Sequence, residues 1–403
     1  MQSVFLKLEH ILQKNQSLWR FEPFHQSIQS QLACSGDYPD LYQWLSALSI
    51  EQVRRYKSST SELMNDVTSV FPQAEELKGL ISLSMATKEL VSLERGLDSG
   101  IPGRKLEQIV SMGSFALAHH KGGEWLEWCS GKGYLGRILA SRSTQPVVSF
   151  EWQTSLCELG QREAIKKSLP MTFIQGDALS EKARDIVTSN QHVVALHACG
   201  DLHVRLIQHA SAAGSQAISI SPCCYHLIEH EKYQPLSEEG LRSTLNLKKA
   251  ELRIPLQETV TGGKRVSRHR EEEMRYRLGF DLVLKNVLGI DSYVAVPSVK
   301  KSMLSEGFEH FCNWAAKEKD INLPVIDFAL WENEGEKRFW QMERQSLLQQ
   351  LFRRALELWL VYDRALFLQQ NGYQVSVVEF CEREVTPRNI MIHAVKKEVC
   401  LGD

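Results

Sequence analysis

The sequence predicts an α/β protein built on a parallel, doubly wound sheet, and two observations support this fold class. Short apolar runs that alternate with helical patterns lie near residues 124–128, 146–151, 171–176, 192–197 and 216–221. Two parallel neighbouring strands must be joined by a long crossover, which is usually a helix, so strands that alternate with helices predict a parallel sheet. The first run also leads into Gly131, Gly133 and Gly136. Glycines there let a backbone approach a ligand closely at the carboxyl end of a strand.

The pattern divides the 403-residue chain into four parts. The predicted parts are a helical N-terminal domain (1–115), the first part of the sheet core (116–225), an inserted substrate or lid region (226–340) and the end of the core (341–403). The first part is predicted helical because its apolar residues recur every three or four positions between prolines. In the last part, Asp363 and Arg364 lie on a helical pattern with an apolar face, and their predicted role is a buried intrahelical or tertiary ion pair.

Composition excludes several classes of protein. A formal net charge of −2 means that any binding of nucleic acid must come from a local basic patch. The sequence contains no apolar run of the ~20 residues that a membrane span needs, and its first residues lack the layout of a signal peptide. The nine irregularly spaced cysteines are typical of reduced thiols. We therefore expect a cytoplasmic protein without membrane contacts.

Acidic residues at three successive strand ends predict which cofactor the sheet binds. These residues are Glu127, Glu151 and Asp177. The glycine spacing also fits a nicotinamide dinucleotide, but three carboxylates are hard to reconcile with an anionic pyrophosphate. S-adenosylmethionine carries an amino group, a sulfonium and a ribose that carboxylates can bind. The sequence therefore favours S-adenosylmethionine, and solvated loop acids are the alternative interpretation.

The order of these residues resembles motifs I to III of the class I S-adenosylmethionine-dependent methyltransferases. That resemblance implies a seven-stranded Rossmann-like sheet, with a last helix at 341–370 and a closing hairpin of strands at 374–381 and 390–395. Cys129 stands where the family usually has its first glycine, and this is a departure from the family pattern in the loop. Four further segments, 193–202, 221–226, 363–368 and 386–389, resemble the methyltransferase-like twenty-five group, which is related to the tRNA acceptor-stem ribose methylases.

The resemblance implies a set of cofactor-binding residues. Glu127 would orient the methionine amino group, Glu151 the ribose and Asp177 the adenine. The full predicted cofactor set is Glu127, Cys129, Gly131, Gly133, Glu151, Asp177, Ala178 and His197.

Residues 197–201, after the fourth strand, are predicted to line the methyl-donor side of the site, and residues 223–226, after the fifth strand, are predicted to line the acceptor side. The predicted catalytic set is Asp201, Cys223, Cys224, Tyr225 and His226. The cysteines allow three interpretations: packing as small apolar residues, zinc binding, or attack of a thiolate on a pyrimidine ring. No Cys-x-x-Cys spacing is present, and adjacent cysteines chelate one metal poorly. We therefore predict no metal, and expect the cysteines to line a pocket in which Tyr225 and His226 position the acceptor.

A local basic segment predicts the substrate. Residues 240–285 contain eleven Lys and Arg against six acids. The densest part is a predicted basic loop with the candidate substrate-binding residues Lys264, Arg265, Arg268 and Arg270. Such an excess suits RNA phosphates. The alternative is a solvated helix face on which Glu271, Glu272 and Glu273 neutralise the arginines.

Together these patterns predict an S-adenosylmethionine-dependent methyltransferase that acts on RNA, either tRNA or rRNA. A protein methyltransferase is the first alternative, because the same pocket could receive a side chain. The second is a non-catalytic RNA-binding protein that retains the cofactor fold. A dinucleotide oxidoreductase is a distant fourth interpretation.

Overall fold

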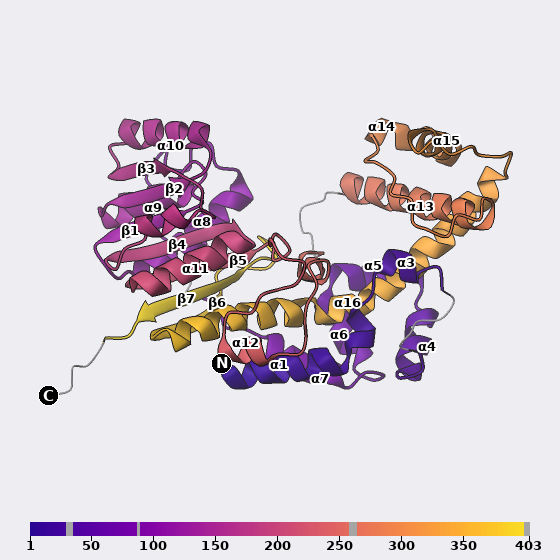
Figure 1. The fold of residues 1–403 in the computed structure, drawn as a ribbon, viewed down its shortest axis with the longest axis horizontal. Helices are drawn as coiled ribbons and strands as arrows, with labels where there is room; N and C mark the ends of the chain where they lie inside the picture. The colour runs from indigo at the N-terminus through magenta and orange to yellow at the C-terminus, as the bar shows by residue number, and fades with distance from the viewer. Residues whose placement is uncertain (30–34, 87–88, 258–263, 399–403) are drawn as a thin grey trace. The chain divides into compact units, whose positions relative to one another are not determined.

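The computed structural model describes residues 1–29, 35–86, 89–257 and 264–398 (Figure 1). The chain forms two compact units, each built from segments far apart in sequence. The first unit contains residues 1–13, 80–260 and 353–403, and the second contains 14–79 and 261–352. These borders differ from the predicted ones at 115, 225 and 340, and the four-part division stays a prediction.

A seven-stranded sheet is the centre of the first unit, in the order β3-β2-β1-β4-β5-β7-β6. The strands are β1 (Glu124–Trp128), β2 (Val147–Glu151), β3 (Met171–Gln175), β4 (Gln191–Cys199), β5 (Ala217–Cys223), β6 (Tyr373–Glu379) and β7 (Ile390–Lys396). The first five strands are parallel, whereas β7 is antiparallel to both β5 and β6. The predicted seven-stranded sheet with its closing hairpin is thus confirmed.

Helices cover both faces of this sheet, because successive side chains of each strand point to opposite sides. On one face, Trp125 of β1 packs in a core with residues of α8 (Gly103–Ala118), α9 (Tyr134–Ser143) and α10 (Thr154–Lys166). Trp128 points to the other face, where its Nε1 donates to the carbonyl of Leu202 at 3.1 Å. Leu202 belongs to α11 (Asp201–Ala213), which lies along β4 and β5 (Figure 1).

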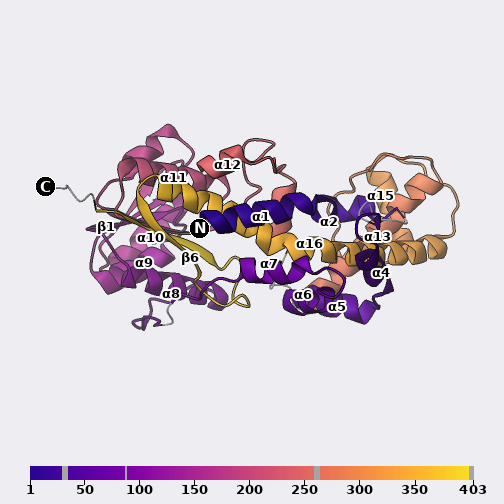
Figure 2. The ribbon, with the colours of Figure 1, turned by 90° about the horizontal axis from the view of Figure 1, so that it is seen from below.

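Helix α16 (Phe328–Gln370) contributes its residues from 353 onward to the first unit. There α1 (Gln2–Lys14) lies along it, as Figures 1 and 2 both show, and the rings of Phe5 and Trp359 stack at 5.3 Å. Helix α16 has 43 residues, and charged side chains are spread along its sequence, so it contains no long apolar stretch. Among the described residues, no helix combines the length and apolar character needed to cross a membrane.

Asp363 and Arg364 of α16 are both fully buried, but no direct ion pair between them is found in the described part of the chain. The Asp363 carboxylate accepts from the Tyr233 hydroxyl at 2.5 Å and from the amide and hydroxyl of Ser237. The Arg364 guanidinium donates to His203 at 2.7 Å and to the Tyr233 hydroxyl at 3.0 Å. The predicted ion pair is therefore wrong as a direct contact. Consecutive helix residues point in different directions, so a tyrosine hydroxyl joins the two side chains.

The inserted region adds only short elements to the first unit. These are α12 (Glu238–Arg242) and the 3₁₀ helix Glu251–Leu256. Outside the inserted region, another 3₁₀ helix, Glu181–Ile186, lies between β3 and β4.

In its described residues, the second unit consists of helices and the loops that join them, without a strand. Its elements are α2 (Gln16–Trp19), α3 (Pro23–Gln26), α4 (Pro39–Ala47), α5 (Ile50–Ser58), α6 (Thr60–Val67), most of α7 (Gln73–Ile81), α13 (Lys264–Asn286), α14 (Lys301–Leu304), α15 (Phe308–Glu318) and the beginning of α16. Tyr276 and Phe280 of α13 pack on Phe308 and Phe311 of α15. The predicted basic loop at 264–270 is corrected by this structure, because these residues form the first turns of α13.

A chain of buried polar side chains crosses the β4, β5 and β7 part of the sheet. His192 Nε2 lies 2.9 Å from Ser219 Oγ, which lies 2.8 Å from His393 Nδ1. Burial lowers the pKa of His192, and the neighbouring His393 lowers it further. Burial, together with His119, lowers the pKa of His393 to about 4. Both imidazoles are therefore neutral in the folded protein near neutral pH.

We predict that the free energy of unfolding falls as the pH is lowered from about 6.5 to about 4. In this window unfolded His393 binds a proton that the folded protein does not accept. One such group contributes up to about 1.4 kcal/mol per pH unit. Urea unfolding at several pH values should show a flatter profile for His393→Gln than for wild type. The exposed His10→Gln should keep the wild-type profile, and equal profiles for His393→Gln and wild type would contradict the assignment.

Candidate active site

The carboxyl ends of β1, β2 and β3 bring the predicted cofactor residues to one edge of the sheet. The register pairs Glu127 with Ser149 and Glu151 with Gln175, and Asp177 follows β3 directly. The buried Glu151 carboxylate accepts from the backbone amide of Gly131 at 2.9 Å and from that of Gln153 at 3.0 Å. Glu151 therefore lies directly against the glycine loop.

Asp177 and Ala178 lie at the next position along this edge. The half-buried Asp177 carboxylate accepts from the Leu179 amide at 2.9 Å, which fixes its orientation at the start of a turn. Ala178 is buried beneath it. One oxygen of Asp177 is held by that amide, and a carboxylate retains capacity to accept from a ligand's amino group.

Glu127 is a buried carboxyl group at the end of β1, 4% exposed. It accepts from the Ser149 hydroxyl at 2.9 Å and from the backbone amides of Gly136 and Leu135 at the start of α9. A Cβ on Gly136 would lie 2.6 Å from a Glu127 oxygen, so a glycine is needed for this close approach. Burial raises the pKa of Glu127 to about 7, against the opposing effect of these hydrogen bonds.

The loop between β1 and α9 has the backbone that a glycine-rich loop requires. Cys129, Gly131 and Gly133 have φ values of 54°, 59° and 70°. Cys129 adopts the left-handed conformation although it has a side chain, at a cost of roughly 1–2 kcal/mol. Cys129 therefore has the backbone conformation that a glycine adopts without this cost.

The two glycines of the loop have different surroundings. A Cβ on Gly133 would lie 2.4 Å from the Phe173 ring, whereas a Cβ on Gly131 would meet nothing within 4 Å. Gly133 is thus needed for packing. Gly131 presents its backbone to open space at the edge where a cofactor is expected.

A β-bulge interrupts β4 between Leu196 and Cys199 and redirects the chain before α11. Within it His197 has a φ of 68°, and its Nε2 lies 2.7 Å from the Gln108 side-chain oxygen. Burial lowers the pKa of His197, and the positive charges of Lys105 and Arg388 lower it further. His197 thus presents a neutral imidazole next to the predicted methyl-donor side.

Gly200 and Asp201 join the ends of β4 and β5. The Gly200 amide donates to the Cys223 carbonyl at 3.1 Å, and the Asp201 amide donates to the Leu227 carbonyl at 3.0 Å. A Cβ on Gly200 would lie 1.9 Å from the Leu227 oxygen, so no other residue allows this approach. The Asp201 carboxylate accepts from the Glu229 amide at 2.8 Å. In the structure Asp201 thus holds the segment after β5 in place.

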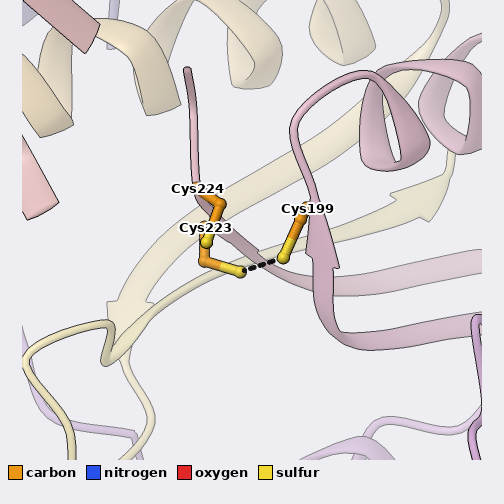
Figure 3. Close-up of side chains that lie close together, drawn as sticks. All are labelled: Cys199, Cys223 and Cys224. Atoms are coloured by element: carbon orange, nitrogen blue, oxygen red, sulfur yellow. Dashed lines mark hydrogen bonds between the residues drawn. The ribbon is translucent and has the colours of Figure 1, made fainter. Parts of the chain in front are cut away.

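Three thiols gather at these joined strand ends, as Figure 3 shows. The Cys199 and Cys223 sulfurs are 3.3 Å apart, and both lie within 4.8 Å of the Cys224 sulfur. Hydrogen bonds from Cys199 and Cys223 lower the pKa of the Cys224 thiol, and the positive charge of Arg388 adds to the effect. The pKa of Cys223 is raised by its hydrogen bonds with Cys199 and Cys224. The cluster therefore favours a thiolate on Cys224.

Tyr225 and His226 differ in how deeply they are buried. The Tyr225 ring is fully buried, its hydroxyl donates to the Pro222 carbonyl at 3.4 Å, and Arg364 lies 5.3 Å from its centre. In this structure Tyr225 is thus a core residue, and its role in positioning an acceptor stays a prediction. His226 is half-buried. Burial lowers its pKa, and the positive charge of Arg253 lowers it further. The role of His226 on the acceptor side stays a prediction.

The predicted substrate-binding arginines lie on the second unit, at the start of α13. Arg265, Arg268 and Arg270 are exposed, and no ion pair involves them among the described residues. The acids that follow pair with other partners. Glu271 binds Arg54 at 3.1 Å, Glu272 lies 3.8 Å from His269, and Glu273 binds Arg277 at 2.7 Å. The three arginines are therefore not neutralised on their own helix, and Lys264 is the first residue of that helix.

The sequence analysis did not identify two polar residues that orient this site. Ser149 donates to Glu127, and Gln108 of α8 contacts His197. A serine in the middle of the apolar strand β2 is a signal that could have revealed Ser149. Gln108 lies on a helix before the sheet, and only the fold brings it to β4.

Comparison with known proteins identifies the domain. Residues 104–231 match a family model described as a methyltransferase domain. The glutathione S-transferase C-terminal domain-containing protein of Xenopus laevis is 30% identical over 131 residues, which are 32% of this chain. The match spans only 20% of the length of that relative.

Several solved structures resemble parts of this chain. The tRNA (uracil-54, C5)-methyltransferase of Pyrococcus abyssi, in complex with S-adenosyl-L-homocysteine, is 22% identical over 29% of this chain and 28% of its own, with a TM-score of 0.25. TrmN of Thermus thermophilus is 17% identical over 29% of this chain and 41% of its own, with a TM-score of 0.25. The precorrin-6y C5,15-methyltransferase of Geobacter metallireducens is 9% identical over 34% of this chain and 69% of its own, with a TM-score of 0.25.

The family match and the seven-stranded fold lead to one conclusion about the first unit. It contains a class I methyltransferase domain, and the cofactor of this domain is S-adenosylmethionine. The individual cofactor contacts of the residues at the strand ends remain predictions.

We predict that affinity for S-adenosylmethionine falls as the pH is lowered below about 7. Protonated Glu127 must lose its proton before it can present a carboxylate to the methionine amino group. The affinity should therefore fall by up to about tenfold per pH unit. Calorimetry with Glu127→Gln should show weaker binding and should lack this part of the pH dependence. The variant also controls for titration of the ligand itself, so parallel pH profiles would contradict the role of Glu127.

Proposed function

We propose that this chain transfers a methyl group from S-adenosylmethionine to RNA, with tRNA or rRNA as the substrate class. The observation that carries the RNA part is the exposed set Arg265, Arg268 and Arg270, which no acid of α13 neutralises in the described structure. A cytoplasmic location is part of the proposal, and so is the likeness to the methyltransferase-like twenty-five group.

One of these arginines, Arg265, lies in the first turn of α13, where its charge is unfavourable for the helix alone. The N-terminus of a helix carries a partial positive charge, and the first turn of α13 contains no acidic residue. A basic side chain there costs roughly 0.3–1 kcal/mol. Arginine binds phosphate through two parallel hydrogen bonds, so an RNA backbone would offset this cost.

The residues of the first unit would act mainly by positioning. S-adenosylmethionine supplies an already activated methyl group, so the protein must chiefly align the acceptor with it. Glu151 would bind the ribose hydroxyls, Asp177 the adenine amino group and Glu127 the methionine amino group. Their separate attachments to backbone amides and to Ser149 hold the carboxylates in place before any ligand binds.

The ends of β4 and β5 would receive the acceptor. His197 and His226 are kept neutral by burial and nearby positive charges, so either imidazole could accept a proton. A thiolate on Cys224 also permits attack on a pyrimidine ring, which is a second route to a methylated base. The acceptor atom itself is not assigned by these residues.

We predict that the variant Arg265→Ala, Arg268→Ala, Arg270→Ala binds RNA more weakly and with a flatter salt dependence. Each phosphate contact removed should lower the slope of log affinity against log salt by about 0.7–0.9. Binding of S-adenosylmethionine should not change. The control Lys301→Ala, Lys317→Ala, Lys319→Ala removes the same charge from exposed positions of the same unit and should keep the wild-type slope.

The activity is tested with labelled S-adenosylmethionine and total RNA and protein from cells that lack the gene. The proposal expects label in RNA, and less label with the arginine variant than with the lysine control. Label only in polypeptide would replace it with a protein methyltransferase. No label in either, together with wild-type RNA binding, would indicate a non-catalytic RNA-binding protein.

A further inference from the structure

The thiols of Cys199, Cys223 and Cys224 form a compact cluster at the joined ends of β4 and β5. Cys199 ends β4, Cys223 ends β5, and Cys224 follows (Figure 3). All three sulfurs lie within 4.8 Å of one another, and among the described residues no other group of histidine, cysteine or acidic side chains is so arranged. All three are free thiols.

The backbone removes the objection that adjacent cysteines chelate poorly. In a regular strand, successive side chains point to opposite faces. Cys224 has a φ of 45°, however, which turns its side chain to the same side as that of Cys223. Figure 3 shows the Cys223 sulfur directed toward that of Cys199, and the Cys224 sulfur lies within 4.8 Å of both. A left-handed residue with a side chain is unfavourable, so packing alone gives no reason for this conformation.

The distances match a metal site better than a disulfide. A zinc–thiolate bond is about 2.3 Å, so two sulfurs on a tetrahedral ion are about 3.8 Å apart. The observed separations, 3.3 Å for Cys199 and Cys223 and at most 4.8 Å for the set, bracket that value. The sulfurs of a disulfide would be about 2.05 Å apart.

The surroundings hold the three sulfurs together and support negative charge. The amide of Gly200 binds the carbonyl of Cys223, and the amide of Leu227 donates to the carbonyl of Cys224 at 2.9 Å. These bonds fix both strand ends independently of any ligand. Arg388 contributes a positive charge that acts on Cys224.

We propose that Cys199, Cys223 and Cys224 bind one thiophilic d10 metal ion, zinc, through their three sulfurs. Each thiol gives up its proton when its sulfur binds the ion. No described side chain completes the tetrahedron, so a water molecule or an atom of the methyl acceptor takes the fourth position, as in zinc sites that act on substrates. This replaces the expectation of a metal-free site, and it does not depend on RNA as the substrate.

The experiment measures zinc in the full chain, purified without chelators under argon with a phosphine reductant. We expect about one zinc per chain by mass spectrometry of the metal, and retention of that zinc against a chromophoric chelator of micromolar affinity. Cobalt should replace zinc and give a thiolate-to-cobalt charge-transfer band. Neither measurement uses S-adenosylmethionine or RNA. A negative result would therefore contradict the zinc site without contradicting the proposed function.

The variants Cys199→Ala and Cys224→Ala should each lose the zinc and the cobalt band. Both positions are only half-buried, which limits the effect on folding, and circular dichroism would verify the fold. The control Cys381→Ala removes a buried thiol of the same unit outside the cluster and should retain the metal. Zinc-free wild type after titration with zinc, or full zinc retention by both folded cluster variants, would overturn the proposal.

Discussion

The buried carboxyl group of Glu127 is the interaction on which the cofactor edge depends. It joins three elements, because it ends β1 and accepts from Ser149 of β2 and from the first amides of α9. These bonds set the distance between β1 and α9, and thereby the path of the loop from Cys129 to Gly133. The neighbouring Glu151 then binds the Gly131 amide from the next strand. The loop is thus positioned by carboxylates before a cofactor arrives.

The same edge also concentrates backbone strain. Cys129 after β1, His197 in β4 and Cys224 after β5 all have positive φ values and all carry side chains. Each such residue costs roughly 1–3 kcal/mol, which the surrounding fold must offset. Bonds between strand ends, such as that of Gly200 to Cys223, hold these conformations. Strain that collects where a ligand is expected is typical of functional sites.

Much of the fold could be predicted from the sequence, because the apolar strands of a parallel sheet are short and regularly separated by helices. The strand ends at Glu127, Glu151 and Asp177 followed from the same pattern. Local conformation could not be predicted in the same way. Nothing in the sequence indicated that Cys224 would be left-handed or that the next residue, Tyr225, would be fully buried. The basic segment at Arg265 was also assigned to a loop, because the preceding stretch 259–263 has the glycines typical of a turn.

Calorimetric titration with S-adenosylhomocysteine and with NAD tests the central claim most directly, namely that carboxylates at three strand ends select S-adenosylmethionine over a dinucleotide. Glu127, Glu151 and Asp177 would face the pyrophosphate of NAD with negative charge, whereas S-adenosylhomocysteine offers them an amino group, a ribose and an adenine. The account predicts one S-adenosylhomocysteine per chain and no heat from NAD under the same conditions. Saturable binding of NAD without binding of S-adenosylhomocysteine would contradict it.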